Sequence, residues 1–333
     1  MTSTSLFRLL LTAGLILGSS FAHGQERKRV VAYVPNWIDL PEFAKTIDYD
    51  KVTHINIAFE NPKDDSGELS FNPRNEELIR RAKAAKVKVL MSIGGGSAST
   101  NEEMKARYDK LMGEAGRKQF AEKLVAYLEA HKLDGIDVDL EGPAITDNYG
   151  GFMAELSAAT KAKKLLLTAA LSKGYGGDHV PDSVLGQLDF LNIMAYDATG
   201  TWDPNRHGQH SSMEFAKEAT KYWTGRGLEK SKAVLGVPFY GYGFGNAFRK
   251  SGYSYADVVA QFPEGHTVDQ SGETIWYNGI PTIQAKSKLV MDEGYGGVMI
   301  WSLDQDVKGE KSLLAAIDGV LQPKKDGAAP KAK

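Results

Sequence analysis

Three carboxylates stand at alternate positions of one apolar segment, LDGIDVDLEG (133–142). Asp137, Asp139 and Glu141 are separated by single branched apolar residues, a pattern typical of a buried strand. Because the side chains of a strand alternate between its two faces, these three share one face and Asp134 lies on the other. Burying an unpaired ionised carboxylate costs several kcal/mol, so we expect a functional role for the three and a structural role for Asp134.

Carboxylates placed so close together favour acid–base chemistry. Like charges on one face cannot all stay ionised, so at least one carboxyl group is expected to hold a proton at neutral pH, as a general acid requires. A fully hydrogen-bonded polar network and a metal site are the alternatives. The H-x-x-H spacing of His207 and His210 lies in a polar loop and is a weak metal signal, and the chain has no cysteine. We therefore expect no metal and no cofactor.

Eight apolar segments that alternate with amphipathic ones are predicted to be strands. Most are continuously hydrophobic, which is typical of parallel strands covered on both faces. The segments are 29–37, 52–60, 87–95, 133–141, 164–172, 188–197, 233–241 and 296–304. They predict an α/β fold, a (β/α)8 barrel in a single domain, with Glu141 at the barrel mouth where such folds carry their sites. A doubly wound open sheet is the alternative, but no Gly-rich dinucleotide-binding fingerprint opens the first unit.

The two ends of the chain differ in composition from the barrel. An apolar run from Leu9 to Leu17, too short to span a bilayer, follows Arg8 and leads to small residues, so 1–24 is predicted to be a secretory signal peptide. An uncleaved anchor is the alternative. We expect the barrel at 25–322 and a disordered basic tail at 323–333. The predicted signal peptide leads us to expect a secreted protein, periplasmic or extracellular. The net charge of −2 favours neither nucleic acid nor anionic membranes as partners.

Four motifs in order along the chain resemble glycoside hydrolase family 18, the chitinases and their relatives. DGIDVDLE (134–141) is similar to the D-G-x-D-x-D-x-E signature of that family. SIGG (92–95), MAYD (194–197) and GGVMIWSLDQD (296–306) resemble its motifs on strands three, six and eight. The likeness extends from Arg29 to about Leu321.

The resemblance implies a retaining, substrate-assisted hydrolysis of β-1,4 bonds next to N-acetylglucosamine. It makes Glu141 the residue that protonates the glycosidic oxygen and later activates water. The acetamido oxygen of the substrate replaces a carboxylate nucleophile, and Asp139 orients the acetamido group. Asp137 would share a proton with Asp139, with Ser92 and Tyr33 below them.

Further residues are carried over from the same resemblance. Tyr196 and Asp197 would hold the acetamido group and the attacking water, and Trp301 would be the aromatic floor under the sugar. Met194 would fill the pocket below the acetamido methyl group. For Met194 and Tyr33, ordinary packing in the barrel interior is an equally good interpretation.

The outer parts of the cleft carry both further candidates and departures from the family pattern. Trp37 and Trp202 are expected to be sugar platforms. Gly142 stands where many chitinases have an aromatic residue, which predicts a more open cleft beside the acid. Tyr242 stands where the family pattern has arginine, so that substrate contact is in doubt. The segment Gly245 to Pro281 is too short for a full insertion domain, which predicts a shallower, less processive site.

The resemblance leaves the substrate open among three kinds of N-acetylglucosamine polymer. A chitinase acting on chitin is the leading interpretation. An endo-β-N-acetylglucosaminidase of glycoproteins and a peptidoglycan hydrolase would use the same acids. A chitinase-like lectin is the alternative from another class, but such lectins lose the acid, whereas Glu141 is present. We expect a monomer that binds an N-acetylglucosamine oligosaccharide.

Overall fold

The computed structural model of the protein describes residues 27–322. Eight parallel strands close into a barrel in the order β1, β12, β7, β6, β5, β4, β3 and β2. Their bounds are β1 (Arg29–Pro35), β2 (His54–Ala58), β3 (Lys88–Gly94), β4 (Gly135–Asp139), β5 (Leu166–Leu171), β6 (Phe190–Ile193), β7 (Ala233–Pro238) and β12 (Gly297–Trp301). Each strand lies inside one predicted segment, and β1 pairs with β12, so the (β/α)8 barrel is confirmed and the open sheet is wrong.

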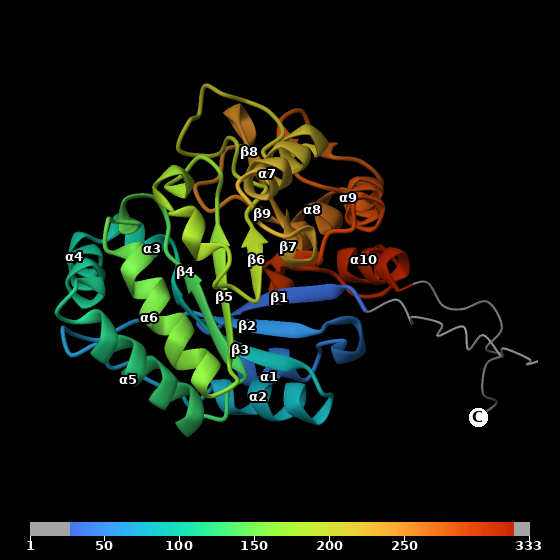
Figure 1. The fold of residues 1–333 in the computed structure, drawn as a ribbon. Helices are drawn as coiled ribbons and strands as arrows, with labels where there is room; N and C mark the ends of the chain where they lie inside the picture. The colour runs from blue at the N-terminus through green and yellow to red at the C-terminus, as the bar shows by residue number, and fades with distance from the viewer. Residues whose placement is uncertain (1–26, 323–333) are drawn as a thin grey trace, which may run out of the picture.

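Helices surround the barrel on its outer side (Figure 1). Their bounds are α1 (Leu40–Ala44), α2 (Asn75–Ala84), α3 (Gly96–Thr100), α4 (Glu102–Met112), α5 (Arg117–Ala130), α6 (Tyr149–Ala162), α7 (Met213–Gly225), α9 (Ile280–Glu293) and α10 (Leu313–Leu321). Ser212 caps α7 and Ser312 caps α10, each by accepting a backbone N–H in the first turn. Polar residues at these positions end the preceding loops and fix where the helices begin.

The layer between strands and helices is apolar, whereas the barrel interior is mixed. In the outer layer, α5 and α6 meet through the rings of Phe120 and Phe152, whose centroids are 5.2 Å apart. The interior holds polar side chains, among them Asp137, Thr168 and Asn192, which have no exposed surface. Buried polar groups are usually hydrogen-bonded, and Asp137 follows that rule, whereas Oδ1 of Asn192 has no partner among the described residues.

Asp134 joins β3 and β4 at the base of the barrel. Its carboxylate accepts hydrogen bonds from the backbone N–H of Val89 and from Nζ of Lys88, both at 3.0 Å. The side chain lies on the opposite face from the interior carboxylates, and its contacts are those of the structural role that we predicted.

A small antiparallel sheet follows β7 and precedes α9. Its order is β10, β11, β8, β9. The bounds are β8 (Tyr240–Gly243), β9 (Tyr253–Ser254), β10 (Gln270–Ser271) and β11 (Ile275–Trp276), with α8 (Tyr255–Gln261) beside them. Figure 1 shows β8 and β9 near α7, at the end toward which β6 points. The short segment therefore does form a folded insertion, but one with strands of only two to four residues.

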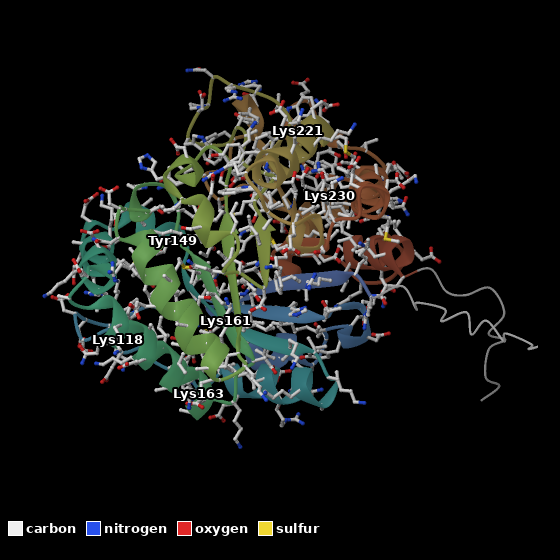
Figure 2. All side chains as sticks on the ribbon, in the orientation of Figure 1. Lys118, Tyr149, Lys161, Lys163, Lys221 and Lys230 are labelled. Atoms are coloured by element: carbon white, nitrogen blue, oxygen red, sulfur yellow. The ribbon has the colours of Figure 1, made fainter. Side chains whose placement is uncertain are left out.

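Charged side chains cover the outer surface. Figure 2 shows Lys118, Lys161 and Lys163 around α5 and α6, where all three are exposed, while Tyr149 of α6 is buried. Between residues 27 and 322, no helix combines the length and the apolar character that crossing a membrane would need. The predicted signal peptide (1–24) and basic tail (323–333) lie outside the described residues.

Candidate active site

Asp137 lies deepest in the barrel and is hydrogen-bonded by four side chains. Its Oδ2 accepts from Tyr33 (2.6 Å) and Ser92 (2.8 Å), and its Oδ1 accepts from Thr168 (2.6 Å) and Asn192 (3.1 Å). Strand register creates this arrangement, because Ser92 of β3 and Thr168 of β5 stand directly opposite Asp137 of β4. Burial raises the pKa of Asp137, and the four donors oppose that effect.

Asp139 stands two residues higher on β4 and has a free oxygen. The residue is only 4% exposed, yet within the described part of the chain its Oδ1 has no hydrogen-bond partner. Burial, followed by the charges of Glu141 and Asp137, raises its pKa well above the usual range. Among the described residues no hydrogen bond joins Asp137 to Asp139, so a shared proton stays a prediction. A buried, unpaired oxygen in a cleft is suited to accept from a ligand.

Glu141 follows the end of β4 at the mouth of the barrel and is partly buried. Burial, and then the charge of Asp197, raise its pKa to about 7. The hydroxyl of Ser99 donates to the main-chain carbonyl of Glu141 at 2.8 Å and holds the backbone there. A carboxyl group that holds and releases a proton near neutral pH can serve as an acid and then as a base.

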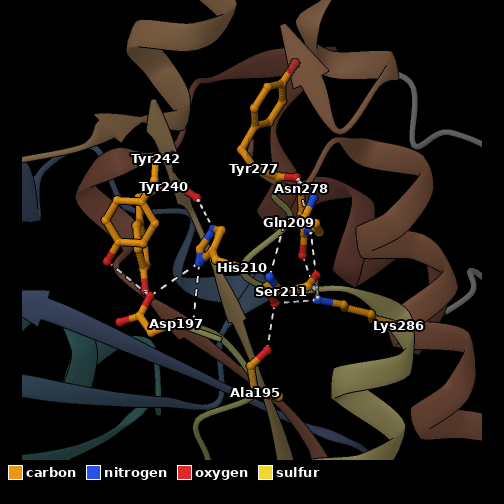
Figure 3. A network of polar contacts seen from close by, with 10 residues as sticks. All are labelled: Ala195, Asp197, Gln209, His210, Ser211, Tyr240, Tyr242, Tyr277, Asn278 and Lys286. Atoms are coloured by element: carbon orange, nitrogen blue, oxygen red, sulfur yellow. Dashed lines mark hydrogen bonds and ion pairs between the residues drawn. The ribbon is translucent and has the colours of Figure 1, made fainter. Parts of the chain in front are cut away.

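Asp197 faces Glu141 from beyond the end of β6, and a group of rings holds its carboxylate (Figure 3). Its Oδ1 accepts from the hydroxyls of Tyr240 (2.5 Å) and Tyr242 (3.1 Å) and lies 3.3 Å from Nδ1 of His210. The backbone of Asp197 is left-handed, with φ of 62°, which turns its side chain away from the strand direction. This turn lets Asp197 and the preceding Tyr196 lie near the same carboxyl groups despite their opposite parity.

Tyr196 and Met194 belong to the apolar lining of the barrel mouth. The Tyr196 hydroxyl donates to Sδ of Met299 at 3.8 Å, and burial, followed by the charge of Asp139, raises the pKa of this phenol. A phenol with a raised pKa keeps its proton and remains a donor. Met194 is 8% exposed and packs in the same inner cluster, a position that fits both core packing and a contact with a bound sugar.

A row of aromatic rings leads from the barrel floor to the surface. Trp301, at the end of β12, lies 5.4 Å from the ring of Tyr33 and 5.7 Å from that of Phe59. Phe59 in turn stacks on Trp37 at 6.3 Å, and Trp37 is 63% exposed. Stacked rings of this kind offer broad apolar faces to sugar rings. The sequence pointed to both tryptophans but not to Phe59 between them.

A second exposed tryptophan stands on another side of the site. Trp202 is 58% exposed, and its ring meets that of Tyr242 edge-on at 5.5 Å. Tyr242 thereby connects this tryptophan to Asp197. The residue at the position of the family arginine is thus part of the site through a different contact.

The two histidines of the H-x-x-H spacing point to different neighbours. His207 stacks on Phe244, with ring centroids 4.9 Å apart, while His210 is buried beside Asp197. In the described part of the chain, no three His, Cys, Asp or Glu side chains form a group that could hold a metal ion. The absence of a metal or cofactor from the protein's chemistry stays an expectation.

The family model of Glycosyl hydrolases family 18 matches residues 29–306. This match covers most of the chain. The chain belongs to glycosyl hydrolase family 18. The recognition made from four short motifs is therefore confirmed.

Relatives of this family 18 protein include chitinases and a protein of another name. The crystal structure of the GH18 chitinase ChiB from the chitin utilization locus of Flavobacterium johnsoniae is 36% identical, with a TM-score of 0.82, covering 89% of this chain and 94% of that one. An endochitinase of Brugia malayi is 28% identical over 81% of this chain and 67% of its own. An oviduct-specific glycoprotein of Mesocricetus auratus is 26% identical over 90% of this chain and 53% of its own.

The family 18 site departs from its usual pattern at Gly142, and the space there is filled. Gly142 has φ of 49°, and a Cβ built on it would lie 2.2 Å from the ring of Tyr175. Tyr175 also accepts the N–H of Gly142 at its carbonyl oxygen, 3.2 Å away, and is 49% exposed. We expected a more open cleft beside the acid because position 142 is glycine. The structure differs from that expectation, because the loop that carries Tyr175 brings an aromatic ring against Gly142.

Proposed function

We propose that this family 18 protein is a chitinase-like hydrolase that cleaves β-1,4 bonds next to N-acetylglucosamine. The observation that carries the proposal is the pKa of Glu141, raised to about 7 at the barrel mouth, two residues beyond the unpaired Oδ1 of Asp139. A general acid works best when its pKa lies near the operating pH. An acetamido N–H is the kind of donor that the unpaired oxygen lacks.

In the proposed reaction Glu141 acts as an acid and then as a base. It donates its proton to the glycosidic oxygen while the acetamido oxygen attacks the anomeric carbon, so the glycosidic bond breaks and an oxazolinium ion forms. The carboxylate of Glu141 then takes a proton from water, and the water oxygen opens the oxazolinium ring at the anomeric carbon. Two displacements give net retention. Asp137, whose oxygens already accept four hydrogen bonds, is not needed as a nucleophile.

The other site residues orient the sugar in this proposal. Asp139 accepts the acetamido N–H and stabilises the positive charge of the intermediate. The Tyr196 hydroxyl donates to the acetamido oxygen, and Asp197 holds the attacking water. Trp301 lies under the distorted sugar, and Met194 contacts the acetamido methyl group.

The outer aromatic residues extend the proposed cleft on two sides. Trp37 and Trp202 are both more than half exposed and present ring faces to solvent. We assign them as platforms for sugars further from the cut. Ser92 and Tyr33 act indirectly, because both donate to Asp137 and fix the base of the column.

Chitin is the proposed polymer, and two other substrates use the same chemistry. The names of the Flavobacterium and Brugia relatives support chitin. An endo-β-N-acetylglucosaminidase or a peptidoglycan hydrolase would need the same acetamido sugar before the cut. A sugar-binding lectin of this fold is the alternative from another class, and the presence of Glu141 with a raised pKa counts against it.

We also propose that the protein is exported and acts as a monomer. Residues 1–24 have the composition of a signal peptide. The side chains of the proposed site all come from one chain. N-terminal sequencing of the exported protein and its elution volume in size-exclusion chromatography test these two points.

A substrate panel tests the proposed function. Chitooligosaccharides, colloidal chitin, a high-mannose glycoprotein and peptidoglycan are incubated with the protein, and the products are read by mass spectrometry. We expect cleavage of the chitin substrates, and proton NMR of the new reducing ends, recorded before they mutarotate, should show retention at the anomeric carbon. Cleavage of only the glycoprotein or only peptidoglycan would replace chitin by that substrate.

Glu141→Gln is the matched variant for the same panel. We expect turnover to fall by at least about 100-fold, since general acid catalysis contributes that much, while oligosaccharide binding measured by calorimetry persists. A wild-type protein that binds chitooligosaccharides but cuts none of the four substrates would be a lectin. A variant with near wild-type turnover would refute the role of Glu141.

A further inference from the structure

Lys286 on α9 is a lysine with no exposed surface. Its Nζ donates three hydrogen bonds of 2.7 Å, to the carbonyl oxygen of Ser211, to Oγ of Ser211 and to Oδ1 of Asn278. No carboxylate of the described chain lies within ion-pair distance of it. Lysine is almost never fully buried unless it is paired with an opposite charge. Burying this ammonium group against neutral acceptors costs free energy, so we expect it to have a specific role.

The proton count of this cluster matches the charged form of Lys286. The hydroxyl of Ser211 donates its only proton to the carbonyl oxygen of Ala195, at 2.7 Å, and can therefore only accept from Nζ. Three acceptors face Nζ, and only an ammonium group has three N–H donors. Burial lowers the pKa of Lys286 to about 7, and the charge of Asp269 opposes that effect.

The residue beside Ser211 is His210, which contacts Asp197 directly. Nε2 of His210 lies 3.3 Å from the carbonyl oxygen of Tyr240, and Nδ1 lies 3.3 Å from Oδ1 of Asp197 and 3.4 Å from its backbone nitrogen. Ser211 is also bonded to Ala195, two residues before Asp197. Figure 3 shows the whole path, from Lys286 through Ser211 and His210 to Asp197.

We propose that Lys286 is a positioning residue for the reaction, acting through Ser211 and His210 to hold the segment after β6 that carries Tyr196 and Asp197. This inference rests on the proposed hydrolase function. Lys286 touches no substrate; it fixes two segments that meet at the site. Reacting groups displaced by about 1 Å can lose about 100-fold in rate, so a remote anchor of this kind affects catalysis.

A purely structural role for Lys286 makes a different prediction. A lysine that only supports α9 would affect the free energy of unfolding and leave the kinetic constants of the folded protein unchanged. A positioning residue would lower kcat, because Tyr196 and Asp197 act on the acetamido group and water in the transition state, with little change in KM.

The test is the kinetics of Lys286→Met on chitotetraose, with Lys288→Met as its matched control. Methionine keeps an unbranched side chain that reaches as far as Cε of lysine, and it removes the charge and the three donors. Lys288 is on the same helix, but it is exposed, and its ion pair within the described residues is with Asp292, at 2.9 Å. We expect kcat of Lys286→Met to fall about 10- to 100-fold with KM within about threefold, and wild-type constants for Lys288→Met.

Ser211→Ala keeps the test decisive if Lys286→Met does not fold. This variant removes the bond to Ala195 and leaves Nζ two acceptors, the carbonyl of Ser211 and Asn278. We expect a loss of kcat of about fivefold or more with circular dichroism unchanged. Wild-type kcat in every folded variant of the pair would overturn the inference. A wild-type protein without turnover on chitotetraose would instead defeat the proposed function, and the inference with it.

Discussion

At the level of single residues, hydrogen-bond donors decide what each carboxyl group of β4 can do. Asp137 is surrounded by four donors, so its oxygens are already used. Asp139 has an unpaired oxygen, and Glu141 has a pKa raised to about 7. Three carboxyl groups within five residues thus differ in hydrogen bonding and in pKa, because each position along the column has different neighbours.

The pKa of Glu141 predicts the effect of Asp197→Asn on the pH profile. The charge of Asp197 is the second cause that raises the pKa of Glu141, after burial, so its removal lowers that pKa. Because the acid must be protonated, we expect the alkaline limb of kcat/KM to move to lower pH by about half a unit to one unit. The measurement is the kcat/KM profile from pH 4 to 9.

Asp134→Asn is the control for that shift, because Asp134 lies on the opposite face of β4. Its alkaline limb should coincide with that of the wild type. The loss of bonds to Tyr240 and Tyr242 will lower the height of the Asp197→Asn profile, but height does not set the position of the limb. A limb at unchanged or higher pH would contradict the assignment.

The same pKa predicts how stability depends on pH. In the folded protein the pKa of Glu141 is about 7, against an ordinary value of 4.5, so between these values the folded state binds more protons than the unfolded state. Stability contributed by this group is therefore present at low pH and lost as the pH rises through about 7. Glu141→Gln should be more stable than the wild type by about 1–3 kcal/mol at pH 8 and about equal at pH 4. Urea unfolding at the two pH values measures this, and a gain of the same size at both would contradict it.

The sequence allowed the column of acids to be predicted, and the family resemblance named Tyr33 and Ser92 below it, but the other partners were not predicted. Alternation along one strand places Asp137, Asp139 and Glu141 on a single face without knowledge of any other strand. Thr168 and Asn192 reach Asp137 only through the register of β5 and β6, which no local pattern reveals. His210 and Phe59 come from loops, and the H-x-x-H spacing suggested a different chemistry for His210.

At the level of elements, the loop after β5 adjusts the family pattern beside the acid. Tyr175 of this loop lies against Gly142, and Gly142 adopts a left-handed backbone that a side chain would strain. The family resemblance leads one to expect an aromatic residue at position 142, directly after the acid, where this chain has glycine. The loop after β5 supplies an aromatic ring at that place instead, through Tyr175.

Gly142→Ala tests this arrangement, with Gly174→Ala as its control. The added Cβ would overlap the ring of Tyr175 and strain the backbone, so we expect a loss of about 1–2 kcal/mol in the free energy of unfolding and a lower kcat/KM. Gly174 lies in the same loop as Tyr175, and a Cβ there would meet nothing within 4 Å. Its variant should keep wild-type activity and stability. Equal behaviour of the two variants, by urea unfolding and chitotetraose kinetics, would show that the Tyr175 contact has no role.

Elements were predicted best where they are long and apolar. Most of the eight barrel strands appear in the sequence as continuous hydrophobic runs, and the observed strand ends lie within a few residues of the predicted ones. The strands of the small sheet have two to four residues, too few for any periodicity to show. The same limit explains why the sequence predicted only that the segment from Gly245 to Pro281 is too short for a full insertion domain, and not which strands it forms.

At the level of the whole molecule, exposed tryptophans lie in two groups of rings, and the small sheet of short strands forms one wall beside the proposed site. Trp37 and Trp202 are exposed and belong to different groups of rings, the first with Phe59 and Trp301, the second with Tyr242. The wall is the small sheet, whose strand β11 pairs Trp276 with Tyr242 of β8. A wall built from such short strands encloses a polysaccharide less than a full domain would.

This shape predicts hydrolysis with frequent release of the polymer. A chain that is held on one open side dissociates after a cut more readily than it slides, because few contacts persist while it moves. In the first minutes on crystalline chitin we expect a mixture of di-, tri- and longer oligosaccharides, with many new reducing ends left on the insoluble chitin. Mass spectrometry of soluble products and a reducing-end assay of the washed solid measure the two fractions. Release of mostly disaccharide from the start would contradict this prediction, because it would show that the site keeps hold of the polysaccharide between cuts.

Trp202→Ala should lower activity on chitin more than on chitotetraose, since an outer platform matters most for a long substrate.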